Sequence, residues 1–169
     1  LLLTAFLIWL HFHALILSLD TTISLEPHRD GIKTPVNAAY HALYDESLSL
    51  YKGMNYPYPE HIVAATELPG MALLVQLIHP IFPSAPNYVF GMAHAIILLS
   101  ILLCALLLYL IFRELKLPVW YSILVSIGLT FLAPQHFRMF PHMGLAPVCV
   151  LPAIIYLLLL FEKRTRWWV

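Results

Sequence analysis

The acidic side chains that could act as general bases or hold a cation gather in one stretch, residues 20–67. This stretch carries seven acids and three bases, a net charge of −4, whereas the rest of the chain carries six bases and two acids, a net charge of +4. Asp30 lies in an Asp-Gly turn close to the first apolar segment, and Glu67 lies within an apolar stretch, where an ionised group is expensive and often functional. We therefore expect Asp30 and Glu67 to be catalytic, with Asp30 as general base or as ligand of a divalent cation.

Both acids also have a structural interpretation. Asp-Gly is a common pair in turns, so Asp30 can serve the turn alone. Glu67 can equally be a buried, hydrogen-bonded carboxylate that stabilises the fold. The sequence leaves both alternatives open.

Cationic side chains that could bind a substrate lie in a second connector, residues 134–143. Arg138 and His142 both belong to it, and positive charge of this kind stabilises a departing phosphate. The alternative for Arg138 is that it extends to lipid head groups from an interfacial position. We expect Arg138 and His142 to contact substrate.

An aromatic block follows the middle of the acidic stretch. Tyr56 and Tyr58 each precede a proline, which favours extended backbone, so the two rings form a stiff platform. Such a platform suits a sugar or a lipid head group, or else anchors the chain at a membrane interface. We expect Tyr56 and Tyr58, with the nearby His61, to bind substrate.

The composition sets the environment of these residues. Of the 169 residues, 61% are hydrophobic and 11% charged, with a mean hydropathy of +0.82, against about 45–50% apolar and about 25% charged in soluble domains. Soluble globular and disordered classes are thereby excluded. The balanced total charge gives no basic field for nucleic acid. Cys104 and Cys149 stand alone in apolar runs, which excludes a disulfide framework.

Four apolar segments approach the roughly 20 residues that cross a bilayer. We therefore expect an all-α, polytopic membrane protein with transmembrane helices at residues 1–19, 88–112, 117–133 and 144–161. The outer loop then covers residues 20–87. It contains an amphipathic surface helix at 35–51, capped by Thr34, and a juxtamembrane segment at 60–83 that prolines interrupt. The alternative is a fifth, proline-broken span at 60–82.

Basic residues predict the orientation of these spans. Five bases flank the ends of the second and fourth spans, and the positive-inside rule places them in the cytoplasm: Arg113, Lys116, Lys163, Arg164 and Arg166. The acidic loop then lies outside the cytoplasmic membrane.

Several motifs together resemble a known enzyme class. Residues 30–33 (DGIK), residues 53–61 (GMNYPYPEH), Arg138 and residues 142–145 (HMGL) are similar to uncharacterised bacterial membrane proteins near the GT-C glycosyltransferases. The resemblance implies a polyprenyl-phosphate sugar donor, an essential carboxylate in the first outer loop at the position of Asp30, and often Mg²⁺ or Mn²⁺. It also implies a bacterial inner-membrane location and a longer chain, because GT-C enzymes have about twice as many spans, or more.

This chain departs from that pattern at two positions. Pro59 stands where the related sequences have glycine, and Glu67 follows Thr66 where they have aspartate. The second change keeps a carboxylate but alters its reach. The competing hypothesis is a non-enzymatic membrane protein, such as a transporter half or a lipid-handling scaffold. We favour the enzyme, because the charges avoid the spans.

Overall fold

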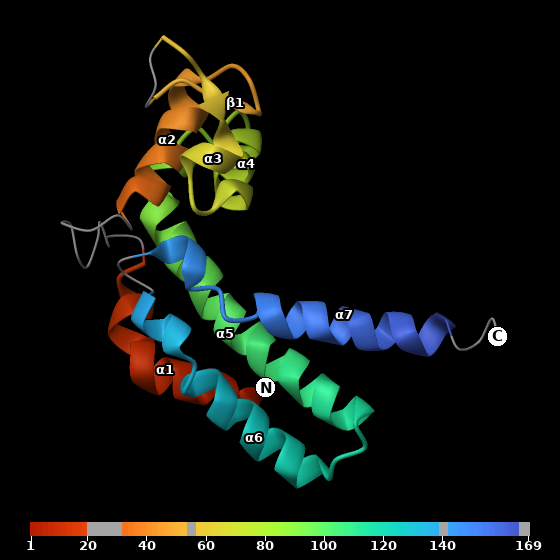
Figure 1. The fold of residues 1–169 in the computed structure, drawn as a ribbon. Helices are drawn as coiled ribbons and strands as arrows, with labels where there is room; N and C mark the ends of the chain where they lie inside the picture. The colour runs from red at the N-terminus through yellow and green to blue at the C-terminus, as the bar shows by residue number, and fades with distance from the viewer. Residues whose placement is uncertain (20–31, 54–56, 139–141, 166–169) are drawn as a thin grey trace. The chain divides into compact units, whose positions relative to one another are not determined.

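The computed structural model describes residues 1–19, 32–53, 57–138 and 142–165. The protein is mostly helical (Figure 1), which confirms the all-α prediction. A two-stranded antiparallel sheet is added to the helices within the described residues. It pairs β1 (Leu50–Tyr51) with β2 (Glu60–His61), with Leu50 opposite His61.

The chain divides into two compact units. One of them, unit 2, contains the acidic stretch and the part of the second connector that carries His142. Unit 1 comprises Leu1–His13, Ile97–His136 and Pro147–Val169, and unit 2 comprises Ala14–Ile96 and Phe137–Ala146.

Four apolar helices correspond to the predicted spans, and all have bounds that differ from the prediction. They are α1 (Leu2–Leu17), α5 (Val89–Glu114), α6 (Val119–Phe131) and α7 (Val150–Thr165). The helical stretch Ala85–Glu114, which includes α5, is the one that is long and apolar enough to cross a membrane among the described residues, whereas α1 is shorter and departs from helical geometry at Phe12. The span predicted from residue 144 starts later, because Met143–Leu145 is a 3-10 turn, η4, and Pro147 follows it.

Helix α6 buries its hydroxyl groups and exposes its apolar side chains. Ser122, Ser126 and Thr130 are buried, and their hydroxyls donate to backbone carbonyls of the same helix or its N-cap at 2.7–3.0 Å. Leu124 and Leu129 on the same helix are exposed. Small hydroxyl residues let helix backbones approach closely where the surrounding medium is itself apolar.

In unit 2, helix α2 (Lys33–Tyr44) packs against α4 (Pro69–Ile78). The surface helix predicted at 35–51 is wrong at its C-terminal end, because α2 ends at Tyr44. The helix stops at Tyr44 because Asp45 is extended and Leu50–Tyr51 pairs with β2. The predicted cap is also wrong, since Thr34 lies buried inside the first turn and the N-cap is Ile32.

The segment predicted to lie along the membrane at 60–83 is built of short pieces. After β2 come α3 (Ile62–Ala65), a break, and then α4, which Pro69 begins. No single helix runs from 60 to 82 within this fully described segment. Further along, a Cβ at Gly91 would overlap the backbone carbonyl of Leu19, so the end of α1 and the start of α5 meet backbone to backbone.

Candidate functional site

Glu67 and His142, which are far apart in the sequence, meet in unit 2. Glu67 lies in the break between α3 and α4, and His142 immediately precedes η4. The Nδ1 atom of His142 lies 3.4 Å from Oε1 of Glu67, and the backbone N–H of Gly144 donates to Oε2 at 3.0 Å. The His142–Glu67 distance is long for a hydrogen bond, as is common for catalytic groups without substrate. The structure thus joins one predicted catalytic residue to one predicted binding residue.

Gly144 makes this contact sterically feasible. A Cβ at this position would overlap the Cβ atom and the backbone carbonyl oxygen of Glu67. The absence of a side chain lets the backbone of η4 come close enough to bond the carboxylate. The sequence shows this glycine in the His-Met-Gly motif, but only the fold reveals what it faces.

A pocket of about 270 Å³ opens beside the pair. The side chains of Glu67 and His142 are 35% and 36% exposed, so both are accessible to a ligand. Thr34 is 1% exposed, and its Oγ1 has no hydrogen-bond partner among the described residues. The pocket is lined by Lys33, Thr34, Ala64, Ala65, Thr66, Glu67 and His142.

The remaining predicted site residues are not part of this pocket, or cannot be placed. Asp30 and Tyr56 lie outside the described residues, and of Arg138 only the backbone is described, at the end of the 3-10 turn η3 (Pro134–Arg138). Tyr58 is 78% exposed. His61 is exposed and caps α3, where its Nδ1 accepts the N–H of Val63 at 3.3 Å.

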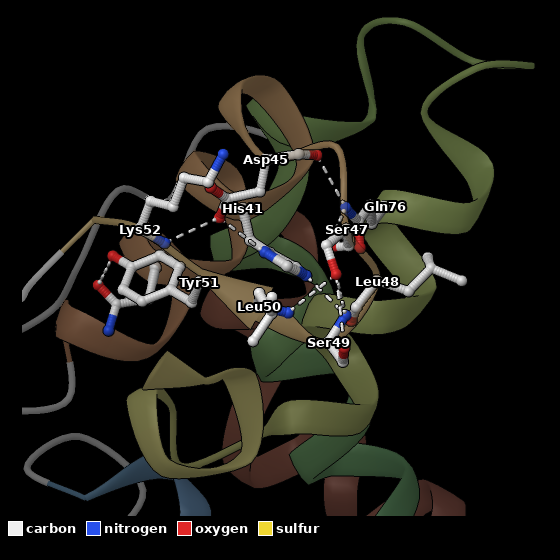
Figure 2. Close-up of polar contacts among 10 residues, drawn as sticks. His41, Asp45, Ser47, Leu48, Ser49, Leu50, Tyr51, Lys52 and Gln76 are labelled. Carbon is white, nitrogen blue, oxygen red and sulfur yellow. Dashed lines mark hydrogen bonds and ion pairs between the residues drawn. The ribbon is translucent and has the colours of Figure 1, made fainter. Parts of the chain in front are cut away.

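A buried polar network, which the sequence analysis missed, supports the unit that carries the pocket (Figure 2). His41 is fully buried; its Nδ1 lies 2.8 Å from Oδ2 of Asp45, and its Nε2 lies 3.3 Å from the carbonyl of Leu48. The amide of Gln76 on α4 donates to the carbonyls of Asp45 and Ser47 at 3.0 and 3.1 Å. The network therefore fixes the chain after α2 to both α2 and α4.

Tyr51 extends this network toward the pocket segment. Its hydroxyl donates to Oδ1 of Asn37 at 2.9 Å, and the amide of Asn37 donates to the carbonyl of Ala65 at 2.6 Å. Burial, with a smaller contribution from the negative charge of Asp45, raises the pKa of Tyr51 to about 12. The hydroxyl hence stays protonated, and remains a donor, throughout the physiological range.

The described residues do not provide a complete metal site. No group of three or more His, Cys, Asp or Glu side chains that could hold a metal ion occurs among them. Divalent cations prefer several oxygen ligands, and the pocket offers the Glu67 carboxylate alone. Asp30 as a cation ligand stays a prediction.

Comparison with known proteins gives no external guide to the site. No protein-family model, curated protein or solved structure matches the chain. The features that indicate a function are the Glu67–His142 pair, the pocket beside it and the apolar helices.

Proposed function

We propose that the protein is a membrane glycosyltransferase that transfers a sugar from a polyprenyl-phosphate donor to an acceptor outside the cytoplasm. The observation that carries this proposal is the Glu67–His142 pair in an accessible pocket. Transfer to a hydroxyl needs a group that accepts the hydroxyl proton, and a carboxylate hydrogen-bonded to an imidazole is suited to that task. The resemblance of residues 30–33 and 53–61 to GT-C enzymes supplies the donor class.

The apolar helices support a location in the membrane. The stretch Ala85–Glu114 is long enough to cross, and α6 turns its hydroxyls inward and its leucines outward. Exposed apolar residues also cover α7, among them Leu151, Leu157 and Leu158. These surfaces favour four membrane helices, in which lipid covers the exposed side chains.

One ion pair supports the predicted orientation. Nζ of Lys163 lies 2.9 Å from Oε2 of Glu114, so the C-terminal end of α7 lies beside that of α5. Both ends carry the bases that the positive-inside rule places in the cytoplasm. A bacterial inner membrane with these basic ends on its cytoplasmic face agrees with the ion pair.

Cysteine labelling tests this orientation. In a chain whose native Cys104 and Cys149 are replaced by serine, a cysteine at the exposed Glu46 is expected to react with an impermeant thiol reagent in intact cells. A cysteine at the exposed Leu115, between α5 and α6, is the matched control and is expected to react only after lysis. The reverse pattern contradicts the orientation.

The transfer reaction itself is tested with Glu67→Gln. In the full-length protein in lipid, supplied with polyprenyl-phosphate sugars and a panel of hydroxyl acceptors, this variant is expected to lose at least about tenfold in kcat. Glutamine keeps the size and the acceptor oxygen but removes the charge. Glu46→Gln, on an exposed side chain, is the control and is expected to retain full activity.

Two results would contradict the proposal. Wild-type turnover in a correctly folded Glu67→Gln variant removes the pair from the reaction. Absence of transfer by the wild type across the donor panel favours the transporter or scaffold hypothesis.

A further inference from the structure

We propose that His142, and not a carboxylate, accepts the proton of the acceptor hydroxyl, while Glu67 acts as a positioning residue. This inference rests on the proposed function and assigns roles within its site. The distances around the pair and the lining of the pocket carry it.

The position of Glu67 selects one form of the neutral imidazole. Nδ1 of His142 faces a carboxylate oxygen, which accepts but cannot donate when ionised, so Nδ1 carries the hydrogen. In the neutral ring, Nε2 then carries the lone pair. Among the described residues, the side-chain hydrogen bond of His142 is made by Nδ1 to Glu67 and leaves Nε2 open to a ligand. His142 is accordingly oriented as a base.

The carboxylate is held in place from its other side. Gly144 donates to Oε2, and Pro69, two residues after Glu67, begins α4. Both oxygens of Glu67 are therefore engaged, one by a backbone donor and one by the imidazole. A carboxylate held in this way is better placed to orient His142 than to take up a proton itself.

The pocket provides room for an alcohol next to the imidazole. Its titratable lining residues among the described positions are Lys33 on α2, Glu67 and His142. Thr34 also lines the pocket, but its hydroxyl oxygen is buried. The part of the pocket open to a ligand therefore offers the imidazole of His142 and space for a hydroxyl group beside it.

The step can be written with its atoms balanced. The acceptor oxygen forms a bond to the anomeric carbon of the sugar, and the bond between that carbon and the phosphate oxygen breaks with its electron pair going to the phosphate. The acceptor proton moves to Nε2 of His142. The products are the glycosylated acceptor and polyprenyl phosphate, and the proton leaves His142 to water. Asp30 then keeps its other predicted role, that of cation ligand.

Ethoxyformylation of histidine tests the orientation without any need for activity. Diethyl pyrocarbonate modifies neutral imidazole, and peptide mass spectrometry of the full chain in lipid reports each histidine. In Glu67→Gln the N–H of Gly144 takes the amide oxygen, so the amide NH₂ faces Nδ1 of His142 and the hydrogen of the neutral ring moves to Nε2. His142 is therefore expected to react about tenfold more slowly in this variant. The exposed His61 is expected to react equally in both proteins, and the buried His41 in neither.

Transfer kinetics test the role in the reaction. His142→Gln is expected to lower kcat by about 10²–10⁴ and to abolish the rise of kcat with pH on the acid side. Glu67→Gln is expected to retain this rise and to leave KM unchanged. Equal modification of His142 in the two proteins overturns the proposal, as does an unchanged pH profile in His142→Gln. Absence of transfer in the wild type, with the modification difference intact, overturns the proposed function instead.

Discussion

Replacement of Asp45 by alanine is expected to destabilise unit 2 by about 1–3 kcal/mol, the range for leaving a buried polar group without its hydrogen-bond partner. Nδ1 of the fully buried His41 lies 2.8 Å from Oδ2 of Asp45, so the substitution removes the partner of a nitrogen that water does not reach. Hydrogen exchange of the amides of residues 33–52, in the full chain, is expected to accelerate by about 10–10².

Two variants separate the pair from general effects of substitution. Glu46→Ala, on the exposed neighbouring residue, is expected to leave exchange unchanged. The double variant His41→Leu with Asp45→Leu removes both partners and is expected to be less destabilised than the sum of its single variants, because neither side chain of the pair is left buried without the other. An exchange rate in Asp45→Ala equal to that of Glu46→Ala shows that the pair contributes nothing to stability.

Asp30→Asn is expected to reduce sugar transfer by at least about tenfold, because a divalent cation held by Asp30 is then bound more weakly. The substitution keeps the shape of the side chain and removes its charge, and with it the affinity for a cation. Arg138→Ala is expected to slow transfer as well, because less positive charge then stabilises the departing phosphate.

The control for Asp30→Asn separates site chemistry from folding. Hydrogen exchange of residues 33–52 is expected to match the wild type, since none of the described contacts of the His41 network involves residue 30. Full turnover in a variant with wild-type exchange rules Asp30 out of the mechanism.

Patterns within short stretches of the sequence predicted the parts of the fold that depend on residues close together in the chain. The absence of charge between residues 68 and 112 and the prolines within it predicted α5 and the break before α4. The end of α2 could not be predicted in this way. Leu50 follows the three- and four-residue spacing of a helix. Its pairing with His61 and the hydrogen bond from the Tyr51 hydroxyl to Asn37 hold this segment in a strand instead.

The candidate site was predicted residue by residue, without its geometry. Glu67 was chosen for its apolar surroundings and His142 for its charge, yet nothing local indicated that they touch across the separation of 75 positions. The same limit applies to His41 and Asp45. They lie one helical turn apart, which predicts contact, but their burial arises only when α4 and the segment after α2 cover them.

The backbone contact between Leu19 and Gly91 restricts the conformational entropy of residues 20–90, because it holds the two ends of that segment together. The segment begins and ends at this contact, and the entropy of closing such a loop grows only slowly with its length. A segment whose ends are fixed together can be exchanged or lengthened while the helices that hold it stay the same. The pocket residues that lie in this segment, from Lys33 to Glu67, can therefore diverge in evolution faster than α1 and α5, whose ends hold the segment.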